Sequence, residues 1–406
     1  MRNEKGFRIL AQNRKISNDI ISTGLNNNDI IIGTSGSGKT GGYVIPNIQN
    51  IIGSLIVSDT KGRLYNRFHD ELEKKGYNVL LLDLVSPGNS CVYNPLSNIR
   101  RYEDGDIYEK DILTLAQSLI MGVEDFSEPI WSLSARSYIA FLICFLLENS
   151  DIPEEEKNLY NLCELNHAFC KEDLGFVDWI HKHPDSFASK KYNEIISNKN
   201  ADKMWASILG FANVALEPYE LKESRHIFGP GKSIDLRDLG RQKTALFLNV
   251  SDVDRAFDNT VNIIYTQALQ VLCSEADKNP DGRLKVPVRI IMDDFASSAK
   301  IEAFDKIISV IRSREIYVSL ILQSLQQLKT LYGEFAASTI IDNCDHILYL
   351  GSQNLETATY IGTRAFMPPE KVLLMPNDSA YLLEKGKFPE LVKKVVPYST
   401  VSDFQL

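Results

Sequence analysis

The stretch that decides the fold lies near the start of the chain, where residues 29–40 read DIIIGTSGSGKT. A short apolar run typical of a β-strand, Asp29–Ile32, leads into GTSGSGKT, which satisfies the pattern G-x-x-x-x-G-K-[ST]. A periodic segment typical of a helix follows until about residue 49. A glycine-rich loop between a strand and a helix predicts a phosphate-binding loop.

The chemistry of such a loop follows from its residue types. Glycines let the backbone wrap closely, so that successive N–H groups and the N-terminus of the next helix point at phosphate oxygens. Lys39 is expected to bridge the β- and γ-phosphates, and Thr40 to offer its hydroxyl to Mg²⁺. We therefore predict ATP and Mg²⁺ as cofactors, held by Gly33, Thr34, Ser35, Gly36, Ser37, Gly38, Lys39 and Thr40.

A second acidic element is needed to hold the metal and orient the attacking water. The strand-like run VRIIMDD ends in Asp293 and Asp294, and the carboxyl ends of parallel strands are where such sheets bind ligands. We assign Asp293 to Mg²⁺ and Asp294 to polarisation of the water. The alternative is a pair of solvated turn aspartates.

Two further catalytic candidates lie in the next strand-like segment. Gln323 follows the run YVSLIL and is placed to sense the γ-phosphate or to hold the water, or else to act as a turn or helix-capping residue. Arg312 and Arg314 stand at the end of the preceding helical segment. One of them is predicted to reach a neighbouring subunit's nucleotide, and the alternative is a surface ion pair at a helix end.

Two kinds of sequence pattern, strand-like and helix-like, occur along the chain. Strand-like runs alternate with helix-like segments at both ends of the chain, which predicts an α/β fold with a mainly parallel central sheet. Between them, about residues 97–237, the pattern is helical throughout. The predicted domains are a nucleotide-binding domain in two parts, 1–96 and 238–406, with an inserted all-α domain over 97–237. The expected strands are 29–33, 54–59, 78–83, 243–250, 287–293, 316–322, 345–350 and 379–383.

Charge and hydropathy narrow the class of protein. The chain carries 44 basic and 53 acidic residues, a net charge of −9, which excludes a basic nucleic-acid coat. The region 101–200 holds 19 acidic against 9 basic residues, so an acidic helical insert could dock a basic protein or give a solvated surface. The longest apolar run, Tyr138–Leu147, is half the length of a bilayer-spanning helix and is expected to be a core helix.

Taken in order, several motifs resemble the coupling-protein ATPases of type IV secretion and conjugation systems, in particular those of Gram-positive conjugative elements. After the phosphate loop come VSDTKGRLY and CVYNPL, and later LGRQKTALFLNVSD and VRIIMDD. Near the end follow IRSREIYVSLILQSLQQL and YGEFAASTIIDNCDHILYLG. The likeness covers about residues 22–365, and its ordered combination is more specific than the phosphate loop alone.

The resemblance implies a RecA-like motor that assembles as a homo-oligomer, a hexameric ring. It implies hydrolysis of ATP to deliver relaxase-bound DNA, single- or double-stranded, to a type IV secretion channel at the inner face of the membrane. By position, Lys39 and Thr40 match the family's Walker A residues, and Asp293 matches its Walker B aspartate. Gln323 matches the family's sensor glutamine, and Arg312 matches its candidate arginine finger. The expected location is the cytoplasm, with membrane association through a separate segment or a partner protein.

Two alternatives stay open, and a departure from the family pattern supports the first of them. Asp294 stands where the family usually has Glu, and Thr60 where the loop Asp59–Gly62 usually has Pro. Because aspartate is one methylene shorter, one alternative is a nucleotide-gated cargo receptor with weak or no hydrolysis. The other is an ATPase that powers channel assembly without touching DNA.

Overall fold

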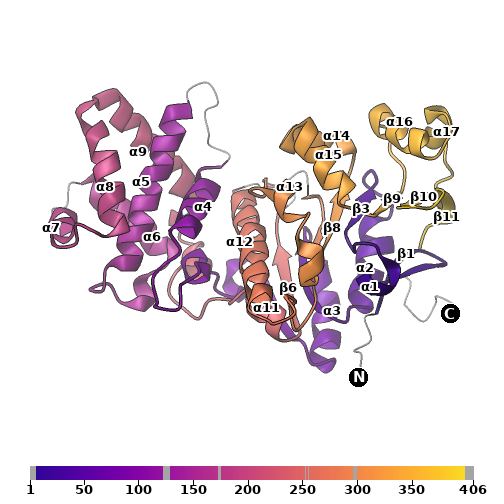
Figure 1. Ribbon diagram of the computed structural model, residues 1–406, viewed down its shortest axis with the longest axis horizontal. Coiled ribbons are helices and arrows are strands. Elements are labelled where there is room, and N and C mark those ends of the chain that lie inside the picture. The colour runs from indigo at the N-terminus through magenta and orange to yellow at the C-terminus, as the bar shows by residue number, and fades with distance from the viewer. Residues whose placement is uncertain are drawn as a thin grey trace. The chain divides into compact units, whose positions relative to one another are not determined.

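The computed structural model of the chain describes residues 6–121, 129–171, 175–251, 253–254, 256–295 and 300–397 (Figure 1). These form two compact units. The first, called here the sheet unit, comprises Met1–Leu80, Arg237–Asn249 and Leu272–Leu406. The second, called the helical unit, comprises Leu81–Leu236 and Val250–Val271. The domain boundaries after residues 96 and 237 stay a prediction, and the units differ from them in grouping 81–96 and 250–271 with the helices.

Among the described residues, one sheet contains nine strands in the order β11-β10-β9-β3-β8-β7-β4-β6-β5, and β1 and β2 form a separate hairpin. The strands are β1 Phe7–Ala11, β2 Arg14–Ser17, β3 Asp29–Ile32, β4 Ser54–Asp59, β5 Asn78–Asp83, β6 Thr244–Asn249, β7 Val288–Met292, β8 Ile316–Leu322, β9 His346–Tyr349, β10 Ser379–Glu384 and β11 Glu390–Lys393.

The centre of the large sheet is parallel. β3 pairs in parallel with β8 and β9, β7 with β8 and β4, and β4 with β6. β10 and β11 continue the sheet in antiparallel pairing beyond β9. Every residue of β3, β4, β7 and β8 is buried, as expected of strands covered on both faces. The predicted α/β fold with a mainly parallel sheet is confirmed.

Helices fill the connections between the strands (Figure 1). They are α1 Ile20–Thr23, α2 Ile45–Gln49, α3 Arg63–Lys74, α4 Glu109–Ile120, α5 Pro129–Glu148, α6 Leu159–Cys170, α7 Gly175–Lys182, α8 Phe187–Ile196, α9 Asp202–Glu220, α10 Arg225–Phe228, α11 Asp238–Arg241, α12 Asp258–Asp277, α13 Phe304–Ile307, α14 Leu325–Tyr332, α15 Glu334–Asp342, α16 Leu355–Arg364 and α17 Pro369–Leu373.

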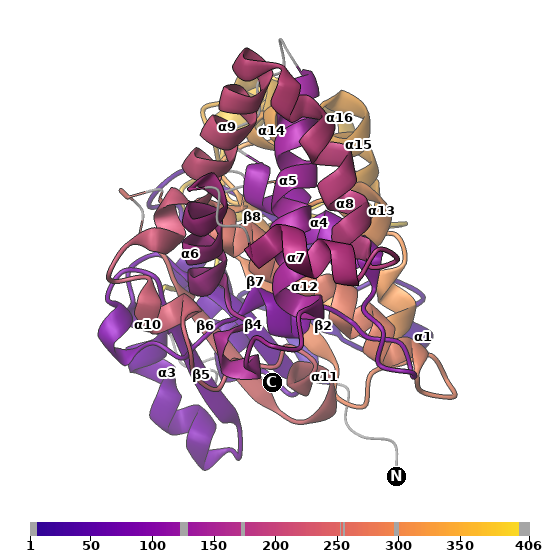
Figure 2. The same ribbon diagram turned by 90° about the vertical axis from the view of Figure 1, so that its left-hand side faces the viewer.

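Helix α5 forms the core of the helical unit, where it packs against α4, α6, α8 and α9 (Figure 2). The run Tyr138–Leu147 is buried throughout, which confirms the predicted core helix. Within the part of the chain that the structure describes, Ile130–Glu148 is the one segment long and apolar enough to cross a bilayer, and 67% of its most apolar part is buried in the protein.

The region 187–216 of the helical unit does not form one helix. It is divided between α8 and α9, with a turn of 3₁₀ helix, Ser197–Asn200, between them. Pro218 lies inside the last turn of α9. Its ring removes the N–H that would bond the Val214 carbonyl one turn earlier. The Pro218 carbonyl itself lies in the last turn, where the helix offers it no donor, and it accepts the Ser224 hydroxyl at 2.6 Å.

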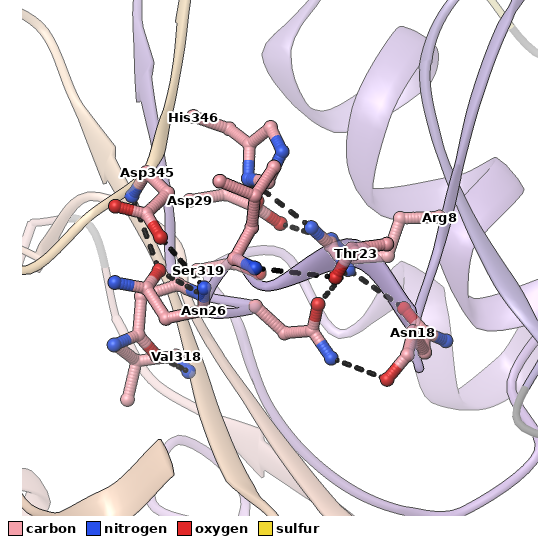
Figure 3. A network of polar contacts seen from close by, with 12 residues as sticks. Arg8, Asn18, Thr23, Asn26, Asp29, Val318, Ser319, Asp345 and His346 are labelled. Carbon is pink, nitrogen blue, oxygen red and sulfur yellow. Dashed lines mark hydrogen bonds and ion pairs between the residues drawn. The ribbon is translucent and has the colours of Figure 1, made fainter. Parts of the chain in front are cut away.

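A buried polar network surrounds Asp29 at the start of β3 (Figure 3). Asp29, the first residue of β3, accepts hydrogen bonds on Oδ2 from Arg8 Nε at 2.9 Å, the Tyr43 hydroxyl at 2.7 Å and Arg289 Nη1 at 3.3 Å. The same Tyr43 hydroxyl lies 2.8 Å from Ser319 Oγ on β8. Because Tyr43 belongs to the helical turn just after the phosphate loop, one carboxylate connects that turn to β1, β3 and β7.

The network holds more positive than negative charge. Arg8 and Arg289 both face Asp29, and each is at most 4% exposed. His346 Nδ1 lies 3.2 Å from Arg8 Nη2. The same Nδ1 lies 3.3 Å from Asp29 Oδ1, so the imidazole faces both the carboxylate and the guanidinium. Asp29 is therefore the anion on which two buried arginines depend.

Candidate functional site

The phosphate loop leaves β3 at Gly33 and turns sharply before the next helix. Gly36 and Gly38 have φ of 77° and 98°, a left-handed backbone that glycine adopts without steric cost. The Lys39 ammonium lies inside the loop, where Nζ donates to the carbonyls of Gly33 at 2.7 Å and Thr34 at 3.2 Å. The loop thus forms a cradle of backbone amides with one buried cation beside it.

The predicted metal-binding residues meet at this loop. Thr40 Oγ1 donates to Asp293 Oδ2 at 2.9 Å, although the two residues are 253 positions apart in sequence. The contact arises because β3 and β7 both pair with β8, so that their carboxyl ends lie at the same edge of the sheet. A hydroxyl and a carboxylate held together in this way offer two hard oxygen ligands, which suit Mg²⁺.

Ser58 is a site residue that the sequence did not indicate. Its hydroxyl on β4 accepts the Asp293 N–H at 2.7 Å and lies 3.2 Å from the Asp293 carbonyl, to which it donates. These contacts hold the backbone of Asp293 from the neighbouring strand. In the sequence Ser58 is simply the fifth residue of the run SLIVSD, so only the strand order identifies its role.

The electrostatics of the acidic pair suit a cation. Burial, reinforced by the neighbouring Asp294 carboxylate, raises the pKa of Asp293 to about 6, against the lowering effects of the Thr40 hydroxyl and Lys39. Asp294 is half-buried with φ of 52°, a left-handed conformation that aspartate tolerates better than most residues. A buried carboxylate beside a second one is stabilised in its charged form by a bound metal ion.

Of the other catalytic candidates, the glutamine lies beside the loop and the two arginines lie away from it. Gln323 directly follows β8, whose last residue Leu322 is paired with Ile32, so Gln323 stands beside Gly33 at the edge of the site. Arg312 and Arg314 precede β8 and lie at the opposite edge of the sheet. Arg312 donates to the Gly24 carbonyl at 2.9 Å, and Arg314 pairs with Asp277. Neither arginine belongs to the nucleotide site of its own chain.

The structure shows a role for the loop Asp59–Gly62 that the sequence did not indicate. Asp59, 4% exposed at the end of β4, accepts the N–H groups of Arg63 at 3.1 Å and Leu64 at 2.6 Å, and also that of Tyr65 at 3.2 Å. Gly62 has φ of 62°. The carboxylate therefore satisfies the free N–H groups at the start of α3, as a helix-capping residue does.

We expect Asp59→Ala to lower the free energy of unfolding by about 2 kcal/mol, the upper end for a lost helix cap. Urea unfolding followed by circular dichroism measures this change. Asp70→Ala is the matched control, because Asp70 lies on α3 with its side chain 75% exposed and should shift stability by less than about 0.5 kcal/mol. Equal effects of the two substitutions would contradict the capping role of Asp59.

Comparison with known protein families gives a match over most of the chain. The family of type IV secretory system proteins for conjugative DNA transfer matches residues 12–364. The chain belongs to this family. The predicted resemblance to the coupling proteins of conjugation systems is confirmed by this match.

Curated relatives in this family are distant in sequence. VirD4 of Rhizobium rhizogenes is 21% identical over 93% of this chain and 60% of its own length. VirD4 of Agrobacterium fabrum gives the same figures. A probable conjugal transfer protein TraG of Sinorhizobium fredii is 21% identical over 83% of the chain and 52% of its own length. The chain thus spans about 60% or less of the length of these relatives.

Solved structures agree on the fold. The bacterial conjugative coupling protein TrwBΔN70 superposes with a TM-score of 0.70 at 14% identity, covering 100% of this chain and 91% of its own. TrwB in complex with ADP and Mg²⁺ gives 0.69 at 15% identity, covering 97% of this chain and 90% of its own. VirB4 of Thermoanaerobacter pseudethanolicus gives 0.59 at 13% identity over 100% of this chain and 99% of its own.

Proposed function

We propose that this chain is the nucleotide-hydrolysing motor of a conjugative coupling protein, which uses ATP and Mg²⁺ to drive DNA into a type IV secretion channel. The observation that carries the proposal is the contact between Thr40 and Asp293 at the phosphate loop. It brings together the two oxygen groups that a Mg²⁺-bound triphosphate requires. TrwB, which shares the fold, is known with ADP and Mg²⁺ and with a non-hydrolysable ATP analogue.

Each site residue has a role in this proposal. Lys39 leaves the loop carbonyls and neutralises the β- and γ-phosphates, while the loop amides bind their oxygens. Thr40 and Asp293 would hold Mg²⁺, which would supply positive charge beside the transferred phosphoryl group. Asp294 polarises the attacking water, and Gln323 at the edge of the site orients it.

The proposed partners follow from the family. They are a relaxase or relaxosome, single- or double-stranded DNA, components of the secretion channel at the membrane, and further copies of this chain in a hexameric ring. In that ring Arg312 supplies positive charge to the neighbouring subunit's nucleotide, which is consistent with its position at the sheet edge away from its own loop. Attachment to the membrane is through another segment or a partner protein.

The test is phosphate release by the purified protein with Mg·ATP, with and without single- and double-stranded DNA. We expect turnover that rises several-fold with DNA. Lys39→Ala should abolish turnover, because removing the only charge within the loop leaves the phosphates without their cation. The variant also controls for a contaminating ATPase, since turnover that survives the substitution does not come from this site and would contradict the proposal.

The short side chain of Asp294, which has a positive φ, favours one competing function, a nucleotide-gated cargo receptor with weak hydrolysis. The receptor predicts ATP binding by the wild type with no turnover above that of Lys39→Ala, even with DNA present. An ATPase for channel assembly instead predicts turnover that DNA does not change. The same assay therefore separates all three functions.

A further inference from the structure

A pocket of about 610 Å³, called here the amino-edge pocket, lies at the amino ends of the central strands of the sheet unit. Its lining includes the first residues of β4 and β7, Ser54 and Val288, and also Tyr317 near the start of β8. The phosphate loop follows the carboxyl end of β3, which is parallel to β8, so the loop lies at the opposite edge of the sheet. The volume is within the range of about 300–1,000 Å³ typical of small-molecule sites.

Backbone contacts hold the walls of the amino-edge pocket in place. The N–H of Ser54 donates to the Pro287 carbonyl at 2.8 Å, and a Cβ atom added at Gly53 would clash with the same carbonyl oxygen. Only glycine therefore lets these two segments approach so closely. The N–H of Leu284 donates to the Arg314 carbonyl at 3.2 Å. The pocket is thus preformed, as sites for small molecules usually are.

The charged groups of the lining are mostly positive. Four basic side chains and two carboxylates line the pocket, namely Lys243, Arg283, Lys285, Arg289, Asp281 and Glu315. Arg283 pairs with the buried Glu315 at 3.2 Å. Lys243 and Lys285 are exposed, and neither pairs with a carboxylate among the residues that the structure describes. The exposed Asp281 accepts the N–H of Arg283 at 3.2 Å and is the other anion of the lining.

Arg289 adds a buried cation whose charge is only partly balanced. It is 4% exposed, and its guanidinium donates to the Ser319 hydroxyl at 2.9 Å and to the Asn27 carbonyl at 3.1 Å. Its one carboxylate contact is with Asp29 at 3.3 Å. Asp29 also pairs with Arg8 at 2.9 Å, so a single carboxylate serves two guanidinium groups. The network behind this part of the lining therefore adds to the positive charge of the pocket.

We propose that the amino-edge pocket binds a phosphate monoester that carries an apolar group. Four cations against two carboxylates leave an excess of two positive charges, which matches the charge of about −1.5 to −2 of such a phosphate at pH 7. Ile51, Ile52 and Pro287 complete the lining and bury the apolar group. The site is separate from the phosphate loop, so the proposal goes beyond ATP hydrolysis and does not depend on it.

Calorimetric titration of the whole chain with phenyl phosphate tests the proposal, with an excess of Mg·ADP present to fill the phosphate loop. Phenyl phosphate should bind at least about fivefold more tightly than inorganic phosphate, because its ring is buried against the apolar lining. Phenol, which has the same ring but no phosphate, should bind at least about tenfold more weakly than phenyl phosphate. Equal affinities in either comparison would contradict the proposed ligand class.

Lys243→Gln combined with Lys285→Gln should weaken phenyl phosphate binding about tenfold, because two cations that face the phosphate are lost. The matched control is Lys306→Gln combined with Lys371→Gln. It removes the same charge from exposed lysines of the sheet unit that do not line the pocket, and binding should stay within about twofold. Since all four lysines are exposed, neither double variant should impair folding. Equal losses in both would indicate general electrostatic attraction and overturn the site.

Two further measurements separate this pocket from other phosphate-binding surfaces. Lys39→Ala, titrated without nucleotide, should bind phenyl phosphate as wild type does with Mg·ADP; loss of binding in this variant would place the phosphate in the loop and overturn the proposal. A single-stranded oligonucleotide is the second probe. If its affinity falls in the Lys243→Gln, Lys285→Gln variant while phenyl phosphate binds no better than inorganic phosphate, the lysines contact a DNA backbone and the small-molecule site is wrong. Neither failure affects the proposed ATPase, which is measured by turnover that requires Lys39.

Discussion

Asp29→Asn should lower the free energy of unfolding by about 3–5 kcal/mol, the range measured when one partner of a buried ion pair is removed. The substitution leaves the guanidinium groups of Arg8 and Arg289 in a buried site without their carboxylate, and an amide cannot replace its charge. It also weakens the acceptor for the hydroxyl of Tyr43, which belongs to the turn after the phosphate loop. Chemical unfolding followed by tryptophan fluorescence or circular dichroism measures the loss.

The same carboxylate predicts how stability depends on pH. Burial raises the pKa of Asp29, but Arg8, together with His346 and Arg289, lowers it further, so that the net pKa lies well below the usual range. In the unfolded chain the pKa of aspartate is about 3.9. The stabilisation is therefore complete above pH of about 5 and is lost as pH falls below 3.9 towards the folded-state pKa. Asp29→Asn should reduce this loss of stability in acid.

Asp378→Asn is the control for both measurements. Asp378 lies in the same unit, and its ion pair with Lys393 is exposed, with 66% of the Asp378 side chain accessible. Exposed pairs contribute about 0–1 kcal/mol, so this variant should unfold almost as wild type does. A loss below 1 kcal/mol for Asp29→Asn would show that the buried arginines find other partners and that the network does not depend on Asp29.

The second large effect is expected at the metal site, where Asp293→Asn should lower the rate of ATP hydrolysis at least about 100-fold. The amide cannot neutralise Mg²⁺, and a loss of roughly 2.7 kcal/mol of transition-state stabilisation is sufficient for that factor. The Thr40 hydroxyl keeps an acceptor oxygen in the variant, so the loop itself should fold unchanged. Single-turnover hydrolysis at saturating Mg·ATP measures the rate.

Asp294→Asn is the matched comparison, because it removes the adjacent carboxylate and leaves the proposed metal ligand in place. We expect its Mg²⁺ requirement to stay near that of wild type while its hydrolysis rate falls by about 100-fold, as for loss of a general base. Titration of Mg²⁺ at fixed ATP separates the two variants, since only Asp293→Asn should shift the Mg²⁺ dependence. If Asp293→Asn hydrolyses ATP at the wild-type rate, Asp293 does not hold the metal ion.

The sequence by itself determined the features that depend on a few consecutive residues. Its apolar runs predicted eight strands of the sheet within a residue or two, and GTSGSGKT predicted the phosphate loop. These predictions were possible because strand burial and the backbone freedom of glycine are expressed within short windows of sequence. By contrast, β1, β2 and β11 were not predicted. β1 contains Arg8, whose burial is understandable only once Asp29 is known to face it.

Only the tertiary structure decided which distant residues meet. Parallel strands are joined through crossovers, so their order in the sheet depends on packing across hundreds of residues and cannot be read from local periodicity. That order places Thr40 against Asp293 and Ser58 behind it, and it puts Arg312 at the opposite edge from the loop. It also brings Lys394 from the end of the described chain to the loop, where its ammonium donates to the Ser37 carbonyl.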